Sequence, residues 1–186
     1  MAFIRSMCVS EKGDFMLGIH MMESPECRVV KTWFNSEKTL EYNYEHQNME
    51  ICAMMAEDMN LAMSGGRNEQ FVLYNLTTGD VLGVFQLGIG RIYGLLRMGN
   101  VVFVGGRSKE VKVFDLVSQE EISTEKITTQ CYIYCMSIGN QLPSGSSEKQ
   151  LTLLVGGWGT PNVTSVKLPE NVSEKSKSSG SNANKK

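Results

Sequence analysis

The chain has 186 residues, of which 41% are hydrophobic and 20% are charged, and its formal net charge is −2. These values are typical of a soluble globular protein that is long enough to build one substantial core. The charge disfavours a nucleic-acid partner, no apolar run is long enough to span a membrane, and the opening residues lack the apolar segment of a signal peptide.

Short apolar segments separated by turn residues predict an all-β protein, because no helical stripe of useful length occurs. The segments fall into four repeats, at about residues 1–45, 46–88, 89–128 and 129–169. In the first repeat we expect four strands, at residues 4–9, 15–18, 28–34 and 39–44.

The second repeat is the most regular, and its four strands are expected at residues 49–55, 60–64, 71–76 and 81–86. Thr77–Asp80 is expected to form the turn before the last strand, with Gly79 supplying a positive φ. The third repeat has the same plan, with strands at 92–97, 101–104, 111–116 and 121–127 and a tight hairpin at 98–100.

The fourth repeat offers three strands, at 132–138, 151–155 and 163–168, with an insertion at 142–148 between the first two. Residues 170–186 then change character, being rich in Ser, Lys and Asn. Such a segment cannot offset its own ordering entropy, so it is expected to be a disordered polar tail after a domain spanning residues 1–169.

One motif recurs about every forty residues. Gly65-Gly66-Arg67 returns as Gly105-Gly106-Arg107, and more weakly as Gly156-Gly157-Trp158. Eight residues after the second glycine of the first two copies stands an aromatic residue, Tyr74 or Phe114. A period of this length made of short strands predicts repeated four-stranded units.

This pattern resembles the WD-repeat β-propeller family. Phe114-Asp115 stands where the family has its Trp-Asp dipeptide, and Tyr74-Asn75 and Trp33-Phe34 are weaker copies. Glu45-His46 lies near the family's Gly-His position. The resemblance implies blades of four antiparallel strands around a central channel.

Two departures from the family affect what we expect. The family's Asp in the turn before the third strand, which bonds the His, is missing from Arg67–Gln70 and Arg107–Glu110. Most members also have about seven blades, so four repeats indicate a partial or degenerate propeller of about four blades. Its open ends predict self-association through unpaired strand edges. A compact four-repeat β-domain of another kind is the alternative.

The residues give no support for catalysis, so no enzyme activity, metal or cofactor is expected. Neither His20 nor His46 neighbours a recognisable nucleophile motif. Gly88–Gly94 contains glycines but opens no helix, as a dinucleotide site would require. Cys131 and Cys135 share strand parity, which predicts two thiols on one face, and buried structural cysteines are favoured over a zinc set.

The favoured function is a non-catalytic scaffold that binds other proteins, or a complex of them, through the blade rim. The resemblance places Arg67, Arg107 and Trp158 on that rim, with Arg91 and Tyr93 close to it. Exposed Arg and Trp often anchor protein interfaces, although Arg after Gly-Gly is also suited to solvating a turn. A small-ligand-binding or enzyme-associated propeller, and a truncated propeller without independent function, are the alternatives. Five cysteines, an odd number, favour reduced thiols and a cytoplasmic location.

Overall fold

A computed structural model describes residues 2–10, 13–21, 27–33, 39–44, 52–122, 127–141, 150–159, 164–168 and 172. Most of these residues lie in antiparallel strands, and the longest described helical segment is a 3₁₀ turn, η1 (Glu57–Met59). The prediction of an all-β protein is confirmed. A search of the described residues finds no helix of the length and hydropathy that a membrane crossing would need.

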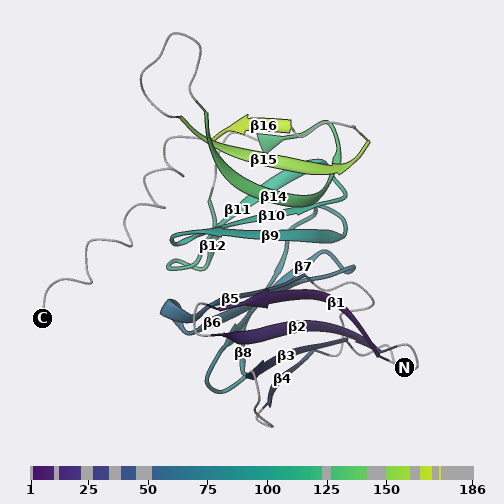
Figure 1. The fold of residues 1–186 in the computed structure, drawn as a ribbon, viewed down its shortest axis with the longest axis vertical. Coiled ribbons are helices and arrows are strands. Elements are labelled where there is room, and N and C mark those ends of the chain that lie inside the picture. The colour runs from purple at the N-terminus through teal and green to yellow at the C-terminus, as the bar shows by residue number, and fades with distance from the viewer. Residues whose placement is uncertain are drawn as a thin grey trace, which may run out of the picture. The chain divides into compact units, whose positions relative to one another are not determined.

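The strands form successive sheets along the chain, as the four repeats predict (Figure 1). The first sheet has the order β1-β2-β3-β4, with bounds Ala2–Val9, Asp14–Met21, Cys27–Trp33 and Thr39–Tyr44. The second has the order β5-β6-β7-β8, with bounds Cys52–Ala56, Leu61–Gly65, Gln70–Asn75 and Val81–Gln86.

In the third sheet the order is β12-β11-β10-β9, with bounds Glu120–Glu121, Glu110–Asp115, Val101–Gly106 and Ile92–Met98. A further strand, β13 (Ile127–Thr128), also pairs with β11. Both ends of the strand expected at 121–127 are therefore in β-structure and pair with opposite ends of β11, whereas residues 123–126 lie outside the described residues.

The fourth sheet has three strands in the order β14-β15-β16, with bounds Tyr132–Gln141, Gln150–Trp158 and Thr164–Lys167. The insertion at 142–148 and all of the expected tail except Val172 lie outside the described residues. Val172 itself is buried, and the disorder expected for the tail stays a prediction.

The chain divides into two compact units, residues 1–95 and 96–186, called here the N-terminal and C-terminal units. Each unit has buried apolar side chains from more than one sheet. In the C-terminal unit they form one cluster: Val101, Phe103, Val111, Val113, Ile122, Ile127, Cys131, Ile133, Leu153, Val155, Leu168 and Val172. In the N-terminal unit the largest buried side chains are Met16, Met63, Phe71, Leu73, Tyr74, Ile89 and Ile92.

The sequence repeat reappears as repeated hydrogen bonds at the ends of β7 and β11. The Asn75 side-chain Oδ1 accepts hydrogen bonds from the backbone N–H of two following residues, at 2.8 and 3.1 Å. Asp115 Oδ1 accepts the equivalent pair at 2.9 and 3.4 Å. The side chain at this position thus closes the turn after the third strand, as Asn and Asp commonly do. Gly79, in the first of these turns, has the expected positive φ of 80°.

The recurrent glycines are required by close approach between sheets. A Cβ placed on Gly65 would overlap the side chain of Ile92, the first residue of β9. A Cβ on Gly105 would overlap Ile133 of β14 in the same way. A glycine on the second strand of one sheet therefore makes room for an isoleucine on the first strand of the next.

A buried hydrogen bond distinguishes the second sheet from the third. Ser64 Oγ and Tyr74 Oη lie 3.0 Å apart across β6 and β7, and both side chains are buried. The positions forty residues later hold Val104 and Phe114, which are also buried. The third sheet therefore replaces both polar partners by apolar ones, an exchange that can be nearly neutral in stability.

We expect Ser64→Ala to lower the free energy of unfolding by about 1–3 kcal/mol, because the buried Tyr74 hydroxyl loses this partner. The double variant Ser64→Val/Tyr74→Phe, which copies the third sheet, should recover most of that loss. Urea denaturation followed by circular dichroism measures both. A double variant no more stable than Ser64→Ala would contradict the interpretation.

The expectation for the two cysteines is half wrong. Cys131 is buried just before β14, as predicted, but Cys135 is exposed. The pairing of β14 with β15 shifts register between Ile133 and Cys135, so Tyr134 is an extra residue that reverses the alternation. Parity arguments assume a regular strand, and this bulge breaks that assumption. Cys135 Sγ lies 3.6 Å from Gly156 O on the paired strand.

Candidate protein-binding site

The best-defined predicted site residue, Arg107, lies in the turn between β10 and β11 and is exposed. In the same turn Lys109 is exposed and has a positive φ of 63°. The buried Thr129 holds this turn, because its backbone N–H donates to Lys109 O at 2.8 Å. Its hydroxyl lies 3.1 Å from the same oxygen and 2.9 Å from Cys131 O. The turn is thereby fixed against the segment that leads into β14.

Both cations of this turn lie near one aromatic ring. Arg107 Cζ is 6.0 Å from the centroid of the Tyr132 ring, and Lys109 Nζ is 5.8 Å from it. These distances are within the range of cation–π attraction. Tyr132 is the Cα partner of Trp158 across β14 and β15, and Trp158 is 72% exposed. We call Arg107, Lys109, Tyr132 and Trp158 the Tyr132 cluster.

The described carboxylate next in sequence to this cluster is engaged elsewhere. Glu110 Oε1 lies 3.4 Å from Lys112 Nζ, which also contacts Glu121 Oε1 at 2.8 Å. The hydrogen bond to Glu121 raises the pKa of Lys112, against the opposing effect of partial burial. These exposed pairs contribute little to stability. They do give Glu110 a cationic partner other than Arg107 and Lys109.

The other three predicted site residues lie in the N-terminal unit. Arg67 is exposed in the turn between β6 and β7, and Arg91 and Tyr93 are half-buried at the start of β9. The backbone N–H of Ile92 donates to Gly66 O at 3.1 Å. This bond brings the backbones of Arg67 and Arg91 together.

The sequence analysis missed two members of the cluster, Lys109 and Tyr132. Tyr132 directly precedes Ile133, just as Arg91 directly precedes Ile92. Tyr132 therefore occupies the position in the fourth repeat that Arg91 occupies in the third, and this equivalence could have predicted it. Lys109 follows Arg107 by two residues, and only the left-handed turn places it near the ring.

No group of three or more His, Cys, Asp or Glu side chains that could hold a metal ion occurs among the described residues. The cluster carries two cations and two aromatic rings. Such a set can attract carboxylates and cover apolar surface.

The sequence matches no protein-family model and no curated protein sequence. Comparison of the fold with solved structures does give matches at low identity. The Dos1 propeller matches with a TM-score of 0.64 at 19% identity, over 82% of this chain and 38% of that one. The RRP9 WD40 repeats match with a TM-score of 0.61 at 14% identity, over 89% of this chain and 50% of that one.

A computationally designed protein, Ika4, matches with a TM-score of 0.63 at 14% identity. The match covers 88% of this chain and 91% of that one. The chain therefore has about the length of Ika4, but it spans half or less of the Dos1 and RRP9 chains. The resemblance inferred from the Gly-Gly repeat is confirmed at the level of fold: the chain has the WD-repeat β-propeller fold, built from four successive sheets.

Proposed function

We propose that the protein is a non-catalytic scaffold that binds a partner protein at the blade rim, with the Tyr132 cluster as the central contact. The observation that carries the proposal is the position of two cations near the Tyr132 ring, with the exposed Trp158 as the Cα partner of Tyr132 on the neighbouring strand. Tyr, Trp and Arg are the residue types that dominate binding hot spots. The fold supports the proposal because WD40 propellers commonly serve as interaction platforms.

The chemistry of the cluster indicates the kind of segment it binds. Arg107 offers a planar guanidinium suited to a carboxylate, and Lys109 adds a second positive charge. Trp158 and Tyr132 offer aromatic surface beside them. We therefore propose a partner segment that carries Asp or Glu next to an apolar side chain. Arg67, Arg91 and Tyr93 are proposed as further rim contacts.

Replacing Arg67, Arg107 and Trp158 together by Ala is expected to abolish capture of a native partner. Each hot-spot truncation costs about 2 kcal/mol or more, which is roughly a thirtyfold loss of affinity. The fold should survive, because all three side chains are exposed and substitutions at the surface usually change stability by about half a kcal/mol or less. A pull-down from native extract, run beside a circular-dichroism melt of each variant, provides the measurement.

The matched control is the double variant Val117→Ala/Glu120→Ala, because both side chains are exposed and lie beyond the other end of β11, Val117 in the turn and Glu120 at the start of β12. This variant should capture the partner as well as the wild type does. Capture through the cluster should also weaken as salt concentration rises. Unchanged capture by the folded triple variant would refute the rim site.

We also propose a cytoplasmic location, which the odd number of cysteines supports. Cell fractionation of the tagged protein tests it. Recovery of the protein in a secreted or membrane fraction would contradict the proposal.

A further inference from the structure

One face of the first sheet is apolar and exposed. On β1, Ile4, Met7 and Val9 are 62%, 60% and 53% exposed, which is unusual for a row of large apolar side chains. Their Cα partners on β2 are the half-buried Ile19, Leu17 and Phe15. We call these six residues the β1 face. Contiguous apolar surface of this kind marks an interaction site.

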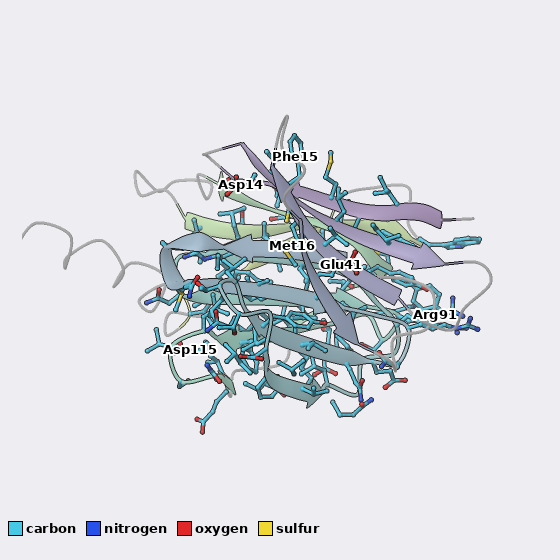
Figure 2. The ribbon with its side chains drawn as sticks, turned by 90° about the horizontal axis from the view of Figure 1, so that it is seen from below. Asp14, Phe15, Met16, Glu41, Arg91 and Asp115 are labelled. Carbon is cyan, nitrogen blue, oxygen red and sulfur yellow. The ribbon has the colours of Figure 1, made fainter. Side chains whose placement is uncertain are left out.

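The opposite face of the same sheet is already covered. Asp14, Met16 and Gly18 alternate with the β1-face residues along β2 and are buried. Figure 2 shows Asp14, Phe15 and Met16 in succession along this strand. In the N-terminal unit β5 packs against both β1 and β2. Within the described part of this sheet, the β1 face is therefore the side on which large apolar side chains remain exposed.

The fold shows how such a face is covered elsewhere. Ile92 fits over Gly65, and Ile133 fits over Gly105. In each case an isoleucine on the first strand of a sheet enters the space left by a glycine on the second strand of the preceding sheet. Ile4 is the equivalent isoleucine on the first strand of the first sheet. Its neighbours in sequence match, because an apolar residue follows three positions after each isoleucine: Met7 after Ile4, Leu95 after Ile92 and Met136 after Ile133.

The complementary surface lies in the C-terminal unit. Gly156, on the second strand of the last sheet, corresponds to Gly65 and Gly105 in the repeat. Among the described atoms, a Cβ on Gly156 would meet only Cys135 Sγ, at 2.9 Å, and no isoleucine. The half-buried Leu154 and the exposed Cys135 and Ser137 surround this position on β14 and β15. Gly156 thus lacks the isoleucine that its equivalents have.

We propose that a second copy of this chain covers the β1 face, with Ile4 fitting over the partner's Gly156. One chain carries both halves of this contact, the isoleucine and the glycine, so a second copy supplies the kind of surface that covers Ile92 and Ile133. Two copies joined by reciprocal contacts contain eight sheets, which is within the range of blade numbers in propellers. This chain spans 50% of the RRP9 WD40-repeat chain, so that chain is about as long as two copies of this one.

The mass in solution provides the first test. Light scattering coupled to size exclusion should give twice the chain mass of 20.7 kDa. Met7→Lys/Val9→Lys should convert the protein to a monomer, because each copy would then bury two uncompensated charges. The matched control is Val81→Lys/Leu82→Lys, which places the same charges on exposed apolar residues of β8 and should remain dimeric. A monomeric wild type at high concentration, or assemblies larger than two copies, would overturn the proposal.

Cross-linking tests the orientation, because the native Cys135 lies beside Gly156. Ile4→Cys should form an intermolecular disulfide with the partner's Cys135 under mild oxidation, identified by mass spectrometry of the joined peptides. Ile4→Cys/Cys135→Ser should lose that product. A disulfide joining residue 4 of one copy to residue 4 of the other would overturn the proposed orientation. So would a folded dimer, verified by circular dichroism, that forms no disulfide to Cys135.

Discussion

Replacing Phe114 with alanine is expected to lower the free energy of unfolding by about 3–5 kcal/mol. Phe114 lies on β11, pairs with Val102 of β10, and is buried. Truncating its ring removes a large apolar contact area and leaves a cavity in the third sheet. A loss of this size is a large share of the total stability of an ordinary domain.

Urea denaturation monitored by circular dichroism and tryptophan fluorescence measures this loss. The matched control is Val117→Ala, three residues away, because Val117 is 66% exposed in the turn after β11. This control should change the free energy of unfolding by about half a kcal/mol or less. A similar midpoint for Phe114→Ala and the wild type would show that the ring does not stabilise the core.

The second large effect is expected at Gly105. In Gly105→Ala the new methyl group overlaps the Ile133 side chain, so β10 and β14 must move apart. Overpacking of this kind costs about 1–3 kcal/mol and occasionally more. Gly105 is not among the glycines of positive φ, so its backbone conformation does not require glycine. The substitution therefore tests whether the close approach of Ile133 requires it.

A double-mutant cycle separates this cause from a general intolerance of alanine at residue 105. Ile133→Ala alone should cost about 2–5 kcal/mol, because Ile133 is buried. In Gly105→Ala/Ile133→Ala the overlap is gone, so the combined loss should be smaller than the sum of the two single losses. Strict additivity would mean that the two residues do not contact each other in the folded protein.

The strands and turns could be predicted because their signals are local. The fourth strand of the second repeat was expected at 81–86, which is where β8 lies. The turn signal at Gly79 was equally direct, since the positive φ needed there favours glycine. In contrast, the sequence did not show that the described ends of the strand expected at 121–127 pair with opposite ends of β11, because strand pairing depends on the rest of the sheet.

The candidate site was only partly visible in the sequence. Arg107 and Trp158 were selected because they follow the Gly-Gly pairs in register. The residue that joins them, Tyr132, is far from both along the chain and is brought to Trp158 by the pairing of β14 with β15. Lys109 reaches the same ring through a left-handed backbone conformation that its side chain does not favour.

The sequence by itself determined the all-β class, the four repeats and the glycine positions. Alternating apolar residues, turn-forming residues and a period of about forty residues are local features that can be recognised in the sequence. Only the tertiary structure decided which faces are covered. The bulge at Tyr134 turned Cys135 outward, and Ile4 was left exposed whereas Ile92 and Ile133 are buried. The physical reason is that burial depends on what packs against a strand. Three isoleucines in equivalent sequence positions can therefore have different surroundings.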